Sequence, residues 1–382
     1  MLATLIRTNG TSFMKNLLIL PLLLACSNTS FVKRTPSSAP LEETISRLKR
    51  IYPDQSEAFI QERYKNAPNA FQKWRSFPPY YYELINRISS HLGNDFFKRS
   101  GLCAGDPHLE NFGFIFLKNT LFTINDLDDA TPCSLNADAM RLFIGHKLVT
   151  SFNSHEWLEE YKSGLNGQTK PLPAYLKRLE ADSLKNKTKM PLNLMRVVES
   201  KNCSGGMLPV TSNEEYMLKE MLNREGKQYL FACSRNKTSG GSAGQKRYLV
   251  FHQQPEKLEA FEIKPLTTPA PIYQIPLTSK EREVIFKEAV NVYLSPKHRT
   301  AWYPVKLQNK LYQRRPVWTG NTEIKETDLS PSDLNEVILY QARTLGNLHR
   351  KTQSGQTLNY SSEQWEKLGK TIERQWRSEF GE

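Results

Sequence analysis

The sequence predicts an α+β protein with two lobes, one mainly helical and one built on a small antiparallel sheet. Segments with helical periodicity and segments with strand alternation occur in separate blocks of the chain, which is typical of α+β folds. The chain has 382 residues, of which 38% are hydrophobic. It is therefore too long for one small domain and apolar enough to form a core in each of two lobes.

The first 26 residues have the pattern of an export signal. Lys15 stands before an apolar run, Leu17–Leu24, that is too short to span a bilayer. The run ends in Leu-Leu-Ala-Cys, which resembles the bacterial lipobox and predicts a lipid anchor on Cys26. A flexible tether over residues 27–40 and a place in the bacterial cell envelope follow, and Ser27 fits the outer membrane. The alternative is an apolar helix with an incidental cysteine, which would leave the protein in the cytoplasm.

Residues 41–225 are expected to form the mainly helical lobe, which also contains the candidate catalytic residues. Apolar residues recur there at helical spacing, and Pro, Gly or Ser separates the segments. The expected helices are Leu41–Lys65, Tyr80–Arg99 after a break at Pro78-Pro79, Asp138–Leu165, Ala174–Leu184 and Asn213–Arg224. We expect Gly101–Asp126 to form a loop and a hairpin, and the basic residues 185–189 to form a linker.

Residues 226–330 are expected to form the sheet lobe, and residues 331–382 the C-terminal helices. Gln228–Lys264 reads mostly as strands, and the Pro- and Thr-rich segment Pro265–Pro276 reads as a loop. The helices expected after this loop are Ser279–Leu294, Ser332–Arg350 and Ser362–Arg377.

The most informative part of the chain is the loop Gly105–Asn111, which reads Gly-Asp-Pro-His-Leu-Glu-Asn. Alternating Phe residues after this loop predict a hairpin that returns Asp126 to the neighbourhood of Asn111. Phosphoryl transfer needs one carboxylate for the incoming hydroxyl, and an amide plus a second carboxylate for Mg²⁺. The candidates are Asp106 as the catalytic residue and Asn111, Asp126 and Asp128 as ligands of Mg²⁺ or Mn²⁺. His108 is expected to hold the loop by hydrogen bonds.

These motifs resemble known phosphotransferases. Gly-Asp-x-His-x-x-Asn followed by Ile-Asp-x-Asp is similar to the site of aminoglycoside phosphotransferases and other small-molecule members of the protein-kinase-like superfamily. The fuller strings Gly105–Gly113 and Ile124–Ala130 look closer to a bacterial family called domain of unknown function 2252. Asp138 and Arg141 are similar to that family's Asp-Leu-x-Arg-Leu helix, which is expected to support the loop. The resemblance runs from about Phe71 to about His349 and implies a kinase-like fold that uses ATP and Mg²⁺.

The resemblance also implies that the nucleotide site follows the catalytic loop in the chain, in a circularly permuted order relative to ordinary kinases. A glycine-rich segment, Ser239–Gly244, precedes two strand-like segments, the second of which ends in Lys264. Glycines let backbone N–H groups approach phosphates, and a lysine on the adjacent strand can reach phosphate oxygens. The expected nucleotide-binding residues are Gly240, Gly241, Ser242, Gly244 and Lys264. Ser239 departs from the family pattern, which has glycine there, and Glu283 or Glu288 is the candidate partner of Lys264.

The charge of the chain favours an acidic partner. The formal net charge is +13, which suits a nucleotide or an anionic membrane surface. The basic residues are scattered and no nucleic-acid-binding module accompanies them, so nucleic-acid binding is not expected. A solvated basic surface is the alternative interpretation.

Four cysteines follow Cys26, namely Cys103, Cys133, Cys203 and Cys233. No Cys-x-x-Cys spacing occurs among them, so a zinc site is not expected. An exported protein could form one or two disulfides from these residues, with three possible full pairings. Cys103 and Cys133 flank the motifs and are candidate neighbours, with buried free thiols as the alternative.

Three functions remain open from the sequence. The first is an ATP- and Mg²⁺-dependent phosphotransferase or nucleotidyltransferase acting on an unknown small-molecule or protein acceptor. The second is an inactive kinase-like binding module anchored at a membrane. The third is a metal-dependent hydrolase that would use Asp106, His108, Asp126 and Asp128. Export conflicts with the use of ATP, because the periplasm and the cell exterior contain little of it. A short distance between Lys264 and Asp126 would favour the first function over the second.

Overall fold

The computed structural model describes residues 41–88, 100–116, 119–187, 189–238, 240–254, 257–294, 301–318, 320–352 and 360–381. The chain divides into two compact units, residues 1–37 and residues 38–382, and only the second contains described residues. The predicted export signal with Cys26, the predicted tether and Ser239 lie outside the described residues. Within the described part, no helix is long and apolar enough to cross a membrane.

The described N-terminal segment forms four short helices. They are α1 (Leu41–Ile51), α2 (Glu57–Lys65), α3 (Ala70–Ser76) and α4 (Pro78–Ile88). The prediction of one helix over Leu41–Lys65 is wrong, because Pro53 lies between α1 and α2 and the Ser56 side chain caps α2 by accepting from the backbone N–H of Phe59. The two prolines at 78 and 79 begin α4 rather than standing before it, which the first helical turn tolerates.

The middle of the chain supplies five more helices. They are α5 (Leu135–Lys147), α6 (Ser154–Leu165), α7 (Ala174–Asn186), α8 (Leu192–Ser200) and α9 (Ser212–Arg224). The predicted single helix over Asp138–Leu165 is divided because Asn153 caps α6, accepting from the backbone N–H groups of His155 and Glu156. The predicted linker at residues 185–189 is partly helical, because α7 continues to Asn186.

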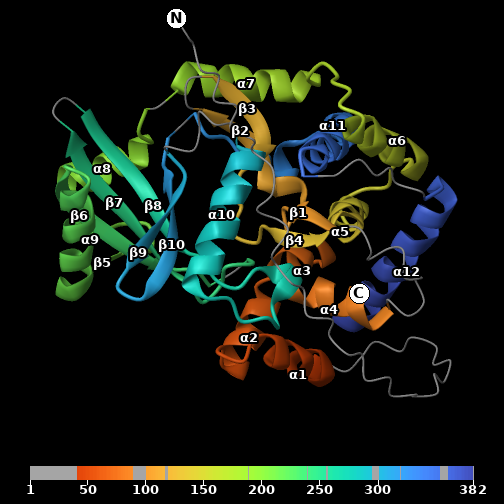
Figure 1. Ribbon diagram of the computed structural model, residues 1–382, viewed down its shortest axis with the longest axis horizontal. Helices are drawn as coiled ribbons and strands as arrows, with labels where there is room; N and C mark the ends of the chain where they lie inside the picture. The colour runs from red at the N-terminus through yellow and green to blue at the C-terminus, as the bar shows by residue number, and fades with distance from the viewer. Residues whose placement is uncertain are drawn as a thin grey trace, which may run out of the picture. The chain divides into compact units, whose positions relative to one another are not determined.

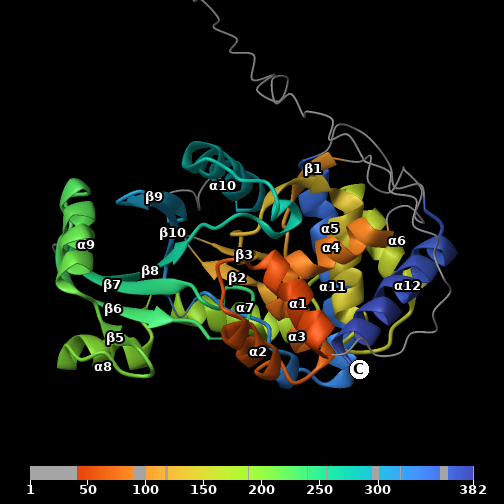
Figure 2. The same ribbon diagram turned by 90° about the horizontal axis from the view of Figure 1, so that it is seen from below.

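The remaining helices agree closely with the sequence prediction. They are α10 (Ser279–Tyr293), α11 (Pro331–Arg350) and α12 (Ser362–Phe380). Capping boxes at Thr278 and Ser361 begin α10 and α12, which explains why their starts were predictable. In Figures 1 and 2, α5, α6, α11 and α12 form a group on the side away from the largest sheet.

The largest sheet has six strands, all antiparallel, in the order β5-β6-β7-β8-β10-β9. The strands are β5 (Leu208–Pro209), β6 (Gln228–Asn236), β7 (Lys246–Gln254), β8 (Lys257–Pro265), β9 (Tyr303–Leu307) and β10 (Lys310–Pro316). The sequence analysis did not predict β9 and β10. Helix α9 packs on β6, and α10 lies between this sheet and β4, contacting β9, β10 and β4 (Figure 1).

Two small antiparallel pairs flank the loops that contain the candidate catalytic residues. They are β1 (Ser100–Cys103) with β4 (Thr131–Ser134), and β2 (Phe112–Phe116) with β3 (Thr120–Ile124). The β2–β3 pair is the predicted hairpin, and Phe112 lies opposite Ile124 in it. Disulfides join Cys103 to Cys133 and Cys203 to Cys233, so the described cysteines are paired rather than free. The fold is thus α+β, as predicted.

Candidate functional site

The loop of residues 104–111, called here the Asp106 loop, places Asp106 beside a buried arginine. Arg141 on α5 donates to Oδ1 of Asp106 through Nε at 2.9 Å and also through Nη2. A Cβ atom built on Gly241 would lie 3.7 Å from Oδ2, so the second oxygen lies near the glycine-rich segment. Burial raises the pKa of Asp106 to about 6; Arg141 opposes the shift, and the nearby carboxylates of Asp128 and Asp126 add to it.

Asp138 on α5 holds the backbone that leads to Asp106. Its carboxylate accepts hydrogen bonds from the backbone N–H groups of Ala104 and Gly105, each at 2.9 Å. Nε2 of His349 on α11 lies 2.9 Å from the same carboxylate, and the hydroxyl of Tyr161 lies 2.7 Å from the other ring nitrogen. His349 therefore belongs to the buried network that supports the Asp106 loop.

Gly105 joins the Asp106 loop to the loop of residues 125–130, called here the Asp126 loop. Gly105 has a φ of +83°, and a Cβ atom at this position would lie 1.9 Å from the carbonyl oxygen of Asp129. Only glycine fits such close backbone packing in this conformation. The two loops are therefore fixed against each other.

The Asp126 loop and Lys264 form a compact charged group. Nζ of Lys264, on β8, lies 2.7 Å from Oδ2 of Asp126 and 2.6 Å from Oδ2 of Asp128. Burial opposes ionisation, but Lys264 and Arg315 hold the pKa of Asp126 well below its usual range. Burial and the charge of Asp126 raise the pKa of Asp128 to about 7. Oδ1 of Asp126 is buried and has no hydrogen-bond partner among the described residues.

Asn111 is oriented by the Asp106 loop itself. Its Nδ2 donates to the carbonyl oxygen of Asp106 at 2.8 Å, which leaves Oδ1 as a possible metal ligand. Its backbone carbonyl accepts from the N–H of Asn125 at 2.9 Å, so the hairpin brings the start of the Asp126 loop to Asn111 as predicted. Asn111, Asp126 and Asp128 line one cavity.

His108 does not hold the loop through its ring. Nε2 lies 3.8 Å from Oδ2 of Asp106, and Nδ1 has no partner among the described residues. Burial, together with Arg75 and Arg141, holds the pKa of His108 well below its usual range, so the ring is neutral. The predicted hydrogen-bonding role is therefore wrong for the side chain. The backbone carbonyl of His108 does accept from the N–H of Asn111.

The glycine loop, defined as the described residues 237–238 and 240–245 between β6 and β7, lines the same cavity. Its ends are joined by hydrogen bonds between the backbones of Lys237 and Gln245 at 3.2 Å and of Gly244 and Lys237 at 2.7 Å. Gly240 and Gly244 have positive φ angles of 76° and 83°. Of the predicted nucleotide-binding residues in this loop, Gly240, Gly241 and Ser242 line the cavity, and Gly244 does not. A Cβ atom on Gly244 would instead approach Phe59 of α2.

The cavity between these loops has a volume of about 260 Å³ and a mixed charge. Its acidic residues are Asp106, Glu110, Asp126, Asp128, Asp129 and Glu323, and its basic residues are Arg75, Lys237, Arg247, Lys264, Arg315 and Lys325. Carboxylates suit a divalent cation and the basic groups suit phosphates, so the lining fits a metal–polyphosphate complex.

Lys237 and Arg247 are among the basic residues of this cavity that the sequence did not predict. Burial and the positive charges of Arg247 and Lys264 lower the pKa of Lys237 to about 8, and the described residues include no carboxylate within ion-pair distance of it. Nε of Arg247 is buried without a partner in the described part of the chain. The sequence does place Arg247 on a strand that follows the glycine loop. Because side chains alternate along a strand, Arg247 lies on the same face of the sheet as Leu249.

The helix after Lys264 does not supply the predicted glutamate. Glu283 on α10 pairs with Lys287 and Lys306, at 2.6 and 3.5 Å, so its prediction as the partner of Lys264 is wrong. Glu288, the other candidate, lies on the same helix, and Lys264 pairs with Asp126 and Asp128 instead.

A second cavity of about 470 Å³ adjoins the first. The two share the residues Asn125, Arg247, Arg315 and Glu323. The second cavity is bordered by the apolar side chains of Phe114, Ile115, Leu194, Val197, Met207, Val317 and Trp318. Glu262 separates two arginines in its wall, accepting from Arg247 at 3.1 Å and from Nε of Arg315 at 2.7 Å.

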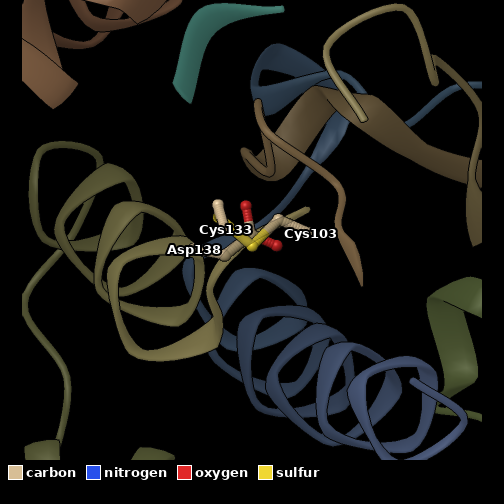
Figure 3. A group of neighbouring side chains, drawn as sticks. All are labelled: Cys103, Cys133 and Asp138. Atoms are coloured by element: carbon tan, nitrogen blue, oxygen red, sulfur yellow. A yellow bond between two sulfur atoms is a disulfide. The ribbon is translucent and has the colours of Figure 1, made fainter. Parts of the chain in front are cut away.

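Cys103, Cys133 and Asp138 also lie close together, as Figure 3 shows, but they do not form a metal site. The two sulfurs are joined in a disulfide and offer no thiolate. The carboxylate of Asp138 is already engaged by Ala104, Gly105 and His349.

Comparison with known protein families gives a match over part of the chain. Residues 99–160 match a family described as an uncharacterized protein conserved in bacteria (DUF2252). The matched segment contains the Asp106 loop, the β2–β3 hairpin, the Asp126 loop and α5. No curated protein and no solved structure matched the chain.

Proposed function

We propose that this chain is a Mg²⁺-dependent transferase that binds ATP and moves a phosphoryl or nucleotidyl group to an acceptor. One observation carries the proposal. A single cavity combines an unpaired carboxylate oxygen of Asp126 with the unpaired Nε of Arg247 and with Lys237, which has no carboxylate partner among the described residues. Buried polar atoms normally have partners, so unpaired atoms of both signs in one cavity support a ligand that contains both a cation and anionic oxygens.

The order of elements supports a permuted kinase-like fold. In protein kinases a glycine-rich loop joins two strands, the phosphate-binding lysine lies on the next strand, and a helix follows. Here the glycine loop joins β6 and β7, Lys264 lies on β8, and α10 follows. The Asp106 and Asp126 loops precede these elements in the chain, whereas kinases have them afterwards.

The proposed ligand spans both cavities. The triphosphate would lie beneath Gly240, Gly241 and Ser242, with Lys237, Arg247 and Lys264 binding its oxygens. The base would enter the larger cavity, whose aromatic and aliphatic lining suits a flat ring.

Asn111 and Asp126 would hold the metal, with Asp128 as a further ligand. The unpaired Oδ1 of Asp126 and the free Oδ1 of Asn111 are the oxygen ligands that Mg²⁺ or Mn²⁺ prefers. The metal would neutralise charge on the phosphate oxygens during transfer. Lys264 pairs with both carboxylates in this structure. With a cation bound to these carboxylates, the Lys264 ammonium would be able to bind phosphate oxygens as well.

Asp106 would orient the acceptor hydroxyl and take its proton late in the step, because bond formation is slight in a loose transition state. Arg141 holds Oδ1, so Oδ2 is the oxygen that would face the acceptor. Ionised Asp106 is the form that accepts a proton, and with its pKa raised to about 6 this form predominates at pH 7.

Transfer of label from ATP tests this proposal. Wild-type protein with ATP labelled at the γ- or the α-phosphate should label itself or an added acceptor, and the position of the label distinguishes phosphoryl from nucleotidyl transfer. Asp106→Asn should lower turnover by at least about a hundredfold while ATP affinity changes little, because general-base contacts act mainly in the transition state. Nucleotide binding without transfer of either label would favour the inactive binding module.

We also propose that the protein is exported and anchored through lipid on Cys26 in the bacterial cell envelope. The four later cysteines form two disulfides, which is typical of oxidising compartments outside the cytoplasm. Intact-mass measurement of protein extracted from membranes should show a chain that begins at lipid-modified Cys26. An unmodified Cys26 in a cytosolic pool would contradict the anchor and would place the protein where ATP is abundant.

A further inference from the structure

A buried arginine on α10 holds the Asp126 loop by its backbone. Arg282 is 3% exposed. Its guanidinium donates to the carbonyl oxygen of Asp128 and lies 3.5 Å from that of Ala130. It also donates to the carbonyl oxygen of Thr267, after β8, at 2.9 Å. One side chain thus joins α10, the Asp126 loop and the end of the strand that carries Lys264.

A second buried arginine holds the glycine loop in a similar way. Arg63 on α2 is fully buried. It donates to the carbonyl oxygen of Gly241 at 3.1 Å and to that of Ser76, and its third contact is Oε1 of Gln55 at 3.2 Å. Gln55 itself donates to the carbonyl oxygen of Ala243 at 3.2 Å. The glycine loop is therefore attached to the N-terminal helices as well as to the sheet.

Neither arginine forms an ion pair with a carboxylate of the described residues, although burial of a guanidinium is costly. Burial lowers the pKa of both. Arg282 contacts two carbonyl oxygens of the Asp126 loop, and Arg63 donates to one carbonyl oxygen of the glycine loop. An arginine can fix several carbonyls at once because its donors form a rigid planar fork, which a lysine cannot reproduce.

We propose that Arg282 and Arg63 are positioning residues, each for one half of the ligand. Arg282 keeps the Asp126 loop in its metal-binding conformation, and Arg63 keeps the glycine loop in its phosphate-binding conformation. The inference rests on the proposed function, because it assigns the metal to one loop and the phosphates to the other. Helix α10 would thus support the metal site through Arg282, whereas the resemblance to kinases implied a glutamate on this helix that pairs with Lys264.

The matched substitutions Arg282→Lys and Arg63→Lys test the inference. Binding of Mn²⁺ alone and of tripolyphosphate in a chelator are measured by calorimetry for wild type and both variants. Arg282→Lys should weaken Mn²⁺ binding by about tenfold or more and leave tripolyphosphate binding within about twofold. Arg63→Lys should do the reverse. A purely structural role would lower thermal stability without this separation, so equal effects on both ligands, or no effect on either, would overturn the inference.

Hydrogen exchange of the wild type gives an answer that does not depend on the folding of a variant. If Arg282 holds the Asp126 loop in its metal-binding conformation before metal binds, the amides of residues 126–130 should exchange slowly without Mn²⁺. Adding Mn²⁺ should then slow their exchange only a little further. Rapid exchange that becomes slow only with Mn²⁺ would overturn the inference. Wild-type protein that binds neither Mn²⁺ nor tripolyphosphate would instead contradict the proposed function.

Discussion

The Asp106 loop and the glycine loop face the same cavity but differ in how their polar groups are satisfied. Asp138 accepts hydrogen bonds from the backbone of the Asp106 loop, and Arg141 donates to the carboxylate of Asp106. The glycine loop is tied at its ends and at its carbonyls, yet Lys237 has no acidic partner among the described residues. The difference indicates that the carboxylate of Asp106 is satisfied within the protein, whereas Lys237 of the glycine loop lacks an anionic partner.

The largest expected effect comes from breaking the support behind the Asp106 loop. Asp138→Ala should leave the buried N–H groups of Ala104 and Gly105 unpaired, and each such group costs about 1–3 kcal/mol. We expect the free energy of unfolding to fall by about 2–6 kcal/mol, measured by urea denaturation. Asp182→Ala is the control, because this exposed aspartate on α7 should change stability by less than about 0.5 kcal/mol. Equal stability of the two variants would show that the loop does not depend on Asp138.

A smaller effect is expected from removing the positive charge of Lys237, on the glycine loop. Lys237→Met should weaken nucleotide binding by about ten- to a hundredfold, which corresponds to a hydrogen bond to a charged group. The free energy of unfolding should change little, because Lys237 has no acidic partner that the substitution would leave unpaired. Lys246→Met is the control, since Lys246 pairs with Glu214 outside the cavity.

The pH dependence of the same binding sharpens this prediction. Burial and neighbouring positive charges lower the pKa of Lys237 to about 8, so the free protein loses this charge as pH rises through 8. Nucleotide affinity of the wild type should therefore fall above pH 8, and Lys237→Met should lack this fall. Conversely, a phosphate bound beside Lys237 should raise the pKa of this lysine, because it stabilises the charged form. An identical pH profile for both proteins would remove Lys237 from the site.

The acidic side could be predicted from the sequence because its parts are close along the chain. A short hairpin joins Asn111 to Asp126, and alternating Phe residues identify it. The approach of Lys264 could not be derived from spacing, because 138 residues separate it from Asp126 and only the family resemblance connected them.

The residues that were missed share a physical reason. Arg247 and Arg315 lie on strands, where a basic residue normally faces solvent, and their shared contact with Glu262 depends on a strand pairing that the sequence did not predict. Strand β9 was missed because it is short and contains Pro304, and β10 was missed because three of its seven residues are basic. Helix α3 has seven residues, too few for a periodic pattern to be recognised.

The most direct test is calorimetric titration with ATP, in the presence of Mg²⁺ and in a chelator, for wild type and Asp126→Ala. Asp126 offers the unpaired carboxylate oxygen, so Mg²⁺ should strengthen ATP binding to the wild type and should have little effect in the variant. Binding without metal should not weaken in the variant, because Lys264 keeps Asp128 and gains freedom to reach the phosphates. An equal gain from Mg²⁺ in both proteins would contradict the assignment of the metal to the Asp126 loop.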